Sequence, residues 1–324
     1  MRSKNVETPE NESGWERQLL EKIALQSLKE SRAKRRWGIF FKLAALVYFV
    51  AVLALVVDFN RGAREKPADG KHTALVNVRG TIEAGGNASA EKINGALRSA
   101  FADKGTAGII LRINSPGGSP VQAGIVHDEI RRLRQKHPDL PLYVVVEDLC
   151  ASGGYYIASA ADRIFVDKAS IVGSIGVLIN GFGFAGLMDE LGIERRLLTA
   201  GENKGFLDPF SPRDDRQVAY AETLLREIHE QFIKVVRQGR GDRLKETPEM
   251  FSGLMWTGSQ SVQLGLADDF GTVDSVAREV IQAENVVDYS VRENLAERVV
   301  KRLGASAVQS LLPLLFDTER VAVR

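Results

Sequence analysis

An apolar run near the N-terminus divides the chain into parts with different physical constraints. Gly38–Val57 holds a single charged residue, Lys42, in twenty positions. A helix of about 20 apolar residues spans the roughly 30 Å hydrocarbon core of a bilayer, and Lys42 lies near enough to its end for the ammonium to reach the headgroups. A buried core helix or a cleaved signal peptide is the alternative, but the run starts late and is long for a signal peptide. We therefore expect a permanent transmembrane helix.

The charges that flank this run predict its orientation. Arg17–Arg36 contains seven lysines and arginines, whereas Asp58–Asn77 contains four. Because the more basic flank of a span stays in the cytoplasm, we expect the N-terminus inside and the rest of the chain exported. The expected organisation is a cytoplasmic tail over 1–37, a transmembrane helix over 38–58, a linker over 59–72 and an extracytoplasmic domain over 73–324.

Composition excludes several classes of function. Lysine and arginine number 43 against 42 aspartates and glutamates, so the net charge of +1 gives no electrostatic reason to expect nucleic acid as a partner. One cysteine excludes an intrachain disulfide, and with four histidines it leaves no basis for a zinc cluster. Gly181–Gly186 matches the G-x-G-x-x-G pattern, but Arg195 and Arg196 follow it where a dinucleotide site needs an acidic residue. We expect no metal and no cofactor.

Beyond the linker, short β-branched runs alternate with stretches of helical periodicity. The expected strands are Thr73–Arg79, Gly108–Ile113, Leu142–Glu147, Ile164–Val166 and Ile175–Ile179, and the expected helices are Ser119–Lys136, Gly153–Ala161, Gln217–Arg237 and Val273–Ala283. Strands that alternate with helices favour an α/β domain with parallel pairing.

A glycine-rich turn follows the second expected strand. Asn114–Ser119 reads NSPGGS and precedes a helix. Adjacent glycines allow positive φ and leave backbone N–H groups uncovered, and such groups at a helix N-terminus can bind an oxyanion. The segment could equally be a plain turn with a helix cap.

A second turn of this kind, Cys150–Tyr156, reads CASGGYY between a strand and a helix. Ser152 could present its hydroxyl above the helix N-terminus, and Gly153 has no Cβ to crowd an incoming carbonyl. A capping serine is the alternative. Cys150 is most simply a small buried hydrophobe.

A nucleophilic serine needs a base. No histidine lies in a loop typical of an active site, although His127 is not excluded. A lysine can serve if burial keeps it neutral. The candidates are Lys204, which lies between two glycines, and Lys168, sixteen residues after Ser152. Ser174, in the segment GSIGV, could orient a lysine amine or only form a turn.

Taken together, these motifs in this order resemble the signal peptide peptidase A family of membrane-anchored serine proteases, in its short single-domain form. The resemblance covers roughly residues 75–283 and implies a fold similar to the Clp protease and crotonase superfamilies, built from stacked ββα units. It implies Ser152 as nucleophile and Lys204, 52 residues later, as base, with Ser174 hydrogen-bonded to the lysine amine. It also implies oxyanion donors at Gly118 and Gly153, and a homo-oligomer. A Clp-like triad would require histidine where Val177 stands.

The resulting expectation is an endopeptidase of the bacterial inner membrane, with its catalytic domain outside the cytoplasm. A Ser–Lys dyad would cleave apolar peptides, released signal peptides above all, through an acyl-enzyme. Two alternatives remain at this point. One is a crotonase-like acyl-CoA enzyme, and the other is a non-catalytic membrane scaffold whose glycines only shape turns.

Overall fold

The computed structural model describes residues 22, 36–51 and 70–291 and divides the chain into two compact units. In the first unit, residues 36–51 are helical and their side chains are exposed. The expected transmembrane helix continues to residue 58, and residues 52–58 lie outside the described part, as do most of the expected cytoplasmic tail and linker. No helix within the described residues is both long and apolar enough to cross a membrane.

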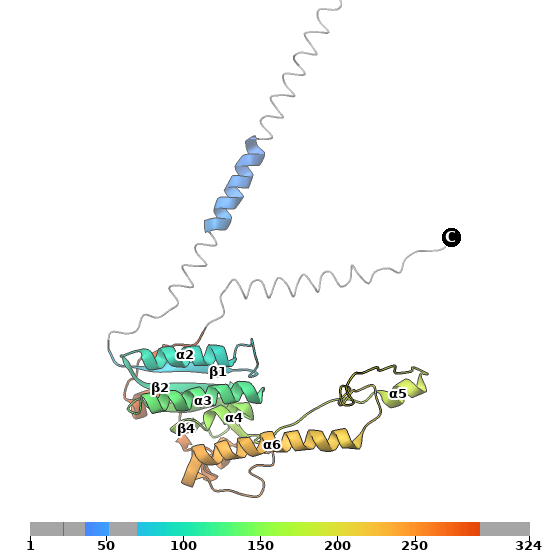
Figure 1. Ribbon diagram of the computed structural model, residues 1–324. Coiled ribbons are helices and arrows are strands. Elements are labelled where there is room, and N and C mark those ends of the chain that lie inside the picture. Colours follow the sequence, from blue (N-terminus) through green and yellow to red (C-terminus); the bar gives the residue numbers. More distant parts are fainter. Residues whose placement is uncertain (1–21, 23–35, 52–69, 292–324) are drawn as a thin grey trace, which may run out of the picture. The chain divides into compact units, whose positions relative to one another are not determined.

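The second unit, Glu65–Glu293, contains the strands and helices of the expected domain (Figure 1). Its strands are β1 (His72–Arg79), β2 (Thr106–Ser115), β3 (Leu142–Ala151), β4 (Arg163–Val166), β5 (Ile171–Gly173), β6 (Met255–Thr257), β7 (Asp269–Phe270) and β8 (Val286–Asp288). Its helices are α2 (Ala90–Ala102), α3 (Pro120–Lys136), α4 (Gly153–Ala158), α5 (Ala185–Glu190), α6 (Asp215–Arg240), α7 (Gly258–Gln263) and α8 (Val273–Ser275), with the short helical turns η1 (Gly241–Arg243) and η2 (Val276–Ile281).

All eight strands form one sheet, in the order β6-β5-β3-β2-β1-β8, with β4 beside β3 and β7 beside β4. Every pairing is parallel except that of β5 with β6. The α/β fold with parallel pairing is therefore confirmed. Because parallel strands carry their C-terminal ends to the same edge, the turns that follow β2, β3 and β5 come together there.

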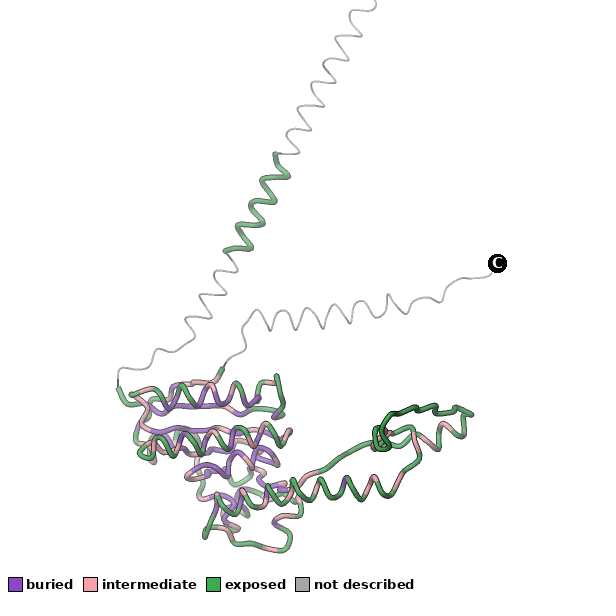
Figure 2. Tube along the Cα trace, in the orientation of Figure 1, coloured by how far each residue is buried: buried purple, intermediate pink, exposed green. Residues whose placement is uncertain are grey.

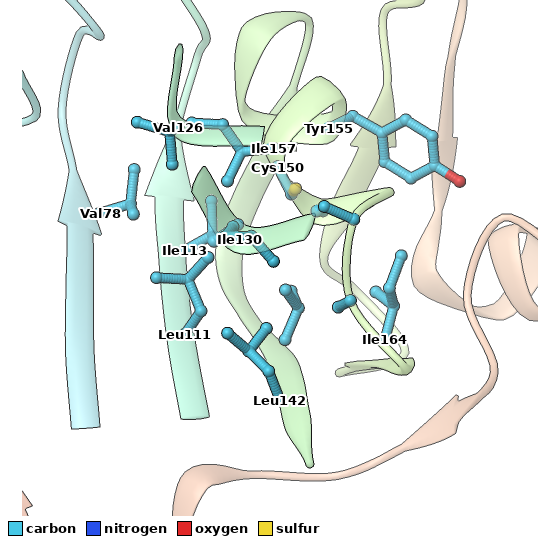
Figure 3. Close-up of a cluster of buried hydrophobic side chains, with 14 of the residues drawn as sticks. Val78, Leu111, Ile113, Val126, Ile130, Leu142, Cys150, Tyr155, Ile157 and Ile164 are labelled. Carbon is cyan, nitrogen blue, oxygen red and sulfur yellow. The ribbon is translucent and has the colours of Figure 1, made fainter. Parts of the chain in front are cut away.

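The main core lies between the sheet and helices α2, α3 and α4. Figure 3 shows how it is built: Val78, Leu111 and Leu142 of the strands face Val126 and Ile130 of α3, and all five side chains are fully buried. Each buried aliphatic side chain of this kind contributes about 1.5–3 kcal/mol. A smaller cluster on the other face packs Leu75, Ile110 and Phe165 against η2. The strands that end at the glycine-rich turns are thus held from both sides.

Helix α6 has a packed half and an extended half. Near its C-terminal end Arg240 is fully buried and forms a bidentate ion pair with Asp268, at 2.8 and 2.9 Å. The N-terminal half is largely exposed (Figure 2). It contacts the segment between β5 and α6 that contains α5, where the Leu207 N–H donates to the Gln217 side chain. We call residues 176–228 the arm. Figure 1 shows α5 at the end of α6 away from the sheet.

Most expected elements occur within a few residues of their bounds, with two differences. The strand expected at Ile175–Ile179 is wrong: β5 ends at Gly173, because Ser174 has a φ of 51°, which is incompatible with an extended strand. Strand β3 also runs on to Ala151, past the expected end at Glu147, because its last residues pair with β5.

Candidate active site

The conformation of the turn after β2 is fixed by backbone hydrogen bonds to the segment that follows β1. The Ile82 N–H donates to Gly117 O at 2.8 Å, and the Ser119 N–H donates to Ile82 O at 2.8 Å. Gly118 has a φ of 147°, and a Cβ at this position would overlap the Ile82 carbonyl. Only glycine fits here, so the alternative of an ordinary cap does not account for the whole turn. Ser119 does cap α3, by accepting from the Gln122 N–H at 3.3 Å.

The turn after β3 places Ser152 in an unusual conformation. Ser152 has φ 51° and ψ −122°, although it is not a glycine, and it precedes the first residue of α4. Its side chain does not cap the helix, so the capping-serine alternative is wrong. A strained serine between a strand and a helix exposes its hydroxyl, as in the nucleophile turn of the α/β-hydrolases. Ser152 is half-buried.

The two turns touch each other through their backbones. A Cβ added to Gly117 would lie 2.7 Å from both the Gly153 nitrogen and the Ser152 Cβ, and a Cβ on Gly153 would lie 3.4 Å from the Gly118 nitrogen. Within the described part of the chain, neither the Gly118 nor the Gly153 N–H donates a hydrogen bond to another residue. The sheet therefore brings Ser152 and two unpartnered donors together, the arrangement that stabilises an oxyanion.

Ser174 lies beside Ser152 at the end of the neighbouring strand. Ala151 pairs with Gly173, and the Ser152 N–H donates to Gly173 O at 2.9 Å. Ser174 is half-buried, and its N–H donates to Leu254 O at 2.7 Å. A Cβ on Gly173 would lie 2.7 Å from the Trp256 ring, so β6 closes tightly over this position.

Lys204 is not brought to Ser152 in this single chain. It is exposed and lies in a turn on the arm, where its N–H donates to Gly201 O at 3.1 Å. Nearby, the Leu207 N–H donates to the Gln217 side chain at 2.8 Å, whereas the His229 ring meets Ile175, next to Ser174, at 3.1 Å. Gln217 and His229 are twelve residues apart on α6, or about 18 Å along its axis. The burial that a neutral lysine needs is also absent here.

The other candidate bases have different surroundings. His127 is buried on α3, with Nδ1 3.2 Å from Asp128 and its ring edge-on to Tyr156. Burial lowers the pKa of His127, against an opposing hydrogen bond to Asp128. Lys168 is exposed in the turn after β4. Neither side chain has a described contact with Ser152.

Residues 134–287 match the model of peptidase family S49. This segment includes the β3–α4 turn with Ser152, as well as Ser174 and Lys204. The chain contains an S49 peptidase domain. The match favours a peptidase over the acyl-CoA enzyme considered above, because the family is defined by peptide hydrolysis.

The chain is also similar to proteins that are named as peptidases or proteases. The chain is 27% identical over 237 residues to the putative signal peptide peptidase SppA of Enterococcus faecium, covering 71% of this chain and 68% of that protein. It is 32% identical over 197 residues to a putative protease of Methanocaldococcus jannaschii, covering 59% and 62%.

A third relative carries a different name. The chain is 44% identical over 209 residues to a protein of Brucella abortus named Na(+)/H(+) antiporter NhaA, covering 63% of this chain. The chain spans only 28% of the length of that relative, so the transport function in its name is not carried over to the S49 domain.

The sequence missed two parts of this site. Ile82, which fixes the Gly117–Gly118 turn, lies after β1 without a distinctive motif. His229, which contacts Ile175, lies in a helix that separates it from the turn by 54 positions. Both contacts depend on long-range packing, which no local pattern encodes.

Proposed function

We propose that this chain is a serine endopeptidase that uses Ser152 as its nucleophile and cleaves peptides through an acyl-enzyme. The observation that carries the proposal is the meeting of the strained Ser152 with the unpartnered N–H groups of Gly118 and Gly153. The S49 match supports the same reaction class.

The proposed chemistry has two halves. A neutral lysine removes the proton from Ser152 Oγ, which attacks the peptide carbonyl and forms a tetrahedral oxyanion. The N–H groups of Gly118 and Gly153 stabilise that oxyanion, with each such donor contributing about 3–4 kcal/mol. The protonated lysine then gives its proton to the leaving amine, and water hydrolyses the acyl-enzyme.

We assign the base to Lys204 of a second copy of the chain. Within one copy, Gln217, which contacts the segment next to Lys204, and His229, which contacts the turn that contains Ser174, are about 18 Å apart on α6. The arm also exposes apolar side chains that a single chain leaves uncovered, among them Leu178 at 78%, Phe182 at 77% and Leu198 at 96%. Exposed apolar surface of this kind is typical of protein interfaces. A homo-oligomer in which the arm reaches the neighbouring Ser152 would bury both the arm and the lysine, with Ser174 orienting its amine.

The proposed setting is the bacterial inner membrane. The apolar run Gly38–Val57 would anchor the chain with its N-terminus in the cytoplasm, and released signal peptides would be the substrates. Cleaved signal peptides are apolar and stay in the bilayer, which accounts for an anchored protease. One relative is named for this substrate class. We further propose that the α/β fold is of the Clp and crotonase type, with stacked ββα units.

The first experiment compares Ser152→Ala, Lys204→Ala and Lys168→Ala in hydrolysis of an apolar fluorogenic peptide by the purified full-length chain. We expect the first two variants to lose at least 1,000-fold in kcat, by analogy with other nucleophile and base deletions. Lys168→Ala should retain activity. Full activity in Ser152→Ala would end the proposal.

A mixing experiment tests the assignment to a second copy. Ser152→Ala and Lys204→Ala should each be inactive alone, but subunits exchanged between them would form some sites with an intact Ser152 and an intact Lys204. Recovered activity on mixing supports the shared site. If the mixture stays inactive although light scattering shows mixed oligomers, Lys204 acts within its own copy or not at all.

A further inference from the structure

Among the described residues, His229 makes one side-chain hydrogen bond, which reaches from α6 to the candidate site. Its Nε2 lies 3.1 Å from the carbonyl oxygen of Ile175, the residue after Ser174. Because a carbonyl oxygen can only accept, Nε2 carries the proton and donates. Ile175 is fully buried, and His229 is half-buried. The contact therefore ties a helix side chain to the backbone of the Ser174 turn.

The Ser174 turn needs such restraints. Ser174 has a φ of 51°, an unfavourable region for a residue with a Cβ, and such conformations persist only where the surroundings fix them. Its N–H donates to Leu254 O at 2.7 Å, and its own carbonyl accepts from the Gly176 N–H at 2.9 Å. The His229 bond is the third restraint, and it acts at the next peptide group. Ser174 Oγ makes no hydrogen bond to a described residue, so its direction depends on the backbone.

His229 also lies at the junction between the packed half of α6 and the arm. On its C-terminal side, Phe232 is buried with its ring 5.1 Å from that of Tyr156 on α4. On its N-terminal side, Tyr220 packs its ring 5.8 Å from Phe206, within the arm. His229 thus contacts the turn that contains Ser174. It also lies where α6 passes from its packed half to the arm, which contains Lys204.

We infer that His229 is a positioning residue for the peptidase reaction. By donating to Ile175 O, it fixes the peptide group between Ile175 and Gly176, whose N–H donates to Ser174 O. It thereby fixes the direction in which Ser174 Oγ meets the lysine amine. This inference rests on the proposed Ser152 chemistry. His229 acts through Ser174 and does not touch the substrate.

The test compares His229→Leu, which removes the donor but keeps most of the volume, with His229→Gln, whose amide N–H can donate over a similar reach. Misplacement of a reacting group by about 1 Å costs on the order of 100-fold in rate, so we expect kcat for the fluorogenic peptide to fall 10- to 100-fold in His229→Leu with KM within about twofold. His229→Gln should recover most of that loss. Glu230→Ala, an exposed neighbour on α6, is the matched control and should behave as the unmodified chain.

A double variant tests whether His229 acts through Ser174. Adding His229→Leu to Ser174→Ala should lower kcat no further than Ser174→Ala alone, because the group being positioned is already gone. Multiplicative losses, or a loss in KM rather than kcat, would overturn the inference. So would unchanged kcat in His229→Leu.

Two further measurements keep the result interpretable. Thermal unfolding and light scattering of each variant separate loss of positioning from loss of folding or assembly, and a His229→Gln variant that folds normally yet stays as slow as His229→Leu also contradicts the inference. Ser152→Ala is run beside them. If Ser152→Ala is inactive while His229→Leu is fully active, the inference alone fails, whereas an active Ser152→Ala removes the proposed function itself.

Discussion

Ser152 and Ser174 occupy equivalent places at the ends of adjacent parallel strands, and both have a φ of 51°. The N–H of Ser152 donates to the carbonyl of Gly173, so the first strained turn is fastened to the residue before the second. Strain at two neighbouring hydroxyl residues is costly, and its presence at one sheet edge is typical of a functional site.

Gly153→Ala should impair activity far more than folding. The added Cβ would lie 3.4 Å from the Ala123 Cβ and from the Gly118 nitrogen, a contact distance that the structure tolerates. It would, however, fill the space between the N–H groups of Gly118 and Gly153. We expect kcat to fall at least 10-fold while the free energy of unfolding changes by about 1 kcal/mol or less. Peptide hydrolysis and urea unfolding measure the two effects. Gly124→Ala is the control, because nothing lies within 4 Å of its Cβ and alanine favours the helix.

Arg240→Ala should destabilise the domain strongly. The buried guanidinium forms two hydrogen bonds with Asp268 and a third with Gly265 O at 2.8 Å. Burial opposes ionisation of Asp268, but the hydrogen bonds from Arg240 hold the pKa of its carboxyl below the usual range. Removing one partner of a buried pair costs about 3–5 kcal/mol.

The control for that variant is Arg237→Ala on the same helix. Arg237 pairs with Glu246 at 2.7 Å, with side chains that are 55% and 41% exposed, and such surface pairs contribute less than about 1 kcal/mol. If urea unfolding shows the same loss of unfolding free energy in the two variants, burial of the Arg240 pair does not contribute to stability.

His127 should make stability depend on pH. Burial holds the pKa of its imidazole below the usual value of about 6.5, although Asp128 opposes this effect and Arg131 adds to it. The unfolded chain therefore binds a proton below about pH 6.5 that the folded chain does not. As the pH falls from 7 the free energy of unfolding decreases, until the pH reaches the folded pKa and the difference becomes constant.

His127→Gln removes this titration, so its free energy of unfolding should fall less than that of the unmodified chain between pH 7 and pH 5. Parallel curves for the two proteins would refute the prediction. The same variant should keep peptidase activity if a lysine is the base, and loss of activity at full stability would instead favour His127.

Cys150 should resist thiol reagents in the folded protein. It is fully buried beside the β3–α4 turn, and Figure 3 shows it among aliphatic side chains of the core. Burial raises the pKa of its thiol well above the usual range, and only the thiolate reacts. A chromogenic disulfide reagent should therefore detect no thiol in buffer and one thiol in denaturant. Rapid labelling in buffer would mean that this turn opens readily.

Features that depend only on neighbouring residues could be predicted from the amino-acid sequence. Alternating β-branched and helical stretches predicted the α/β class, and the glycine pairs at 117–118 and 153–154 predicted the two turns after strands, because positive φ and backbone exposure are local demands of the chain. Ser152 could be singled out in the same way, although its role as a cap remained open.

The arrangement of those turns in space depends on long-range packing. The parallel order of β2, β3 and β5 brings Gly118, Ser152 and Ser174 to one edge, and residues with no motif of their own, Ile82 and His229, hold the turns in place. The position of Lys204 on the arm, away from Ser152 of its own chain, has the same origin. Such contacts join residues tens to hundreds of positions apart and arise from side-chain packing, so no local pattern in the sequence could determine them.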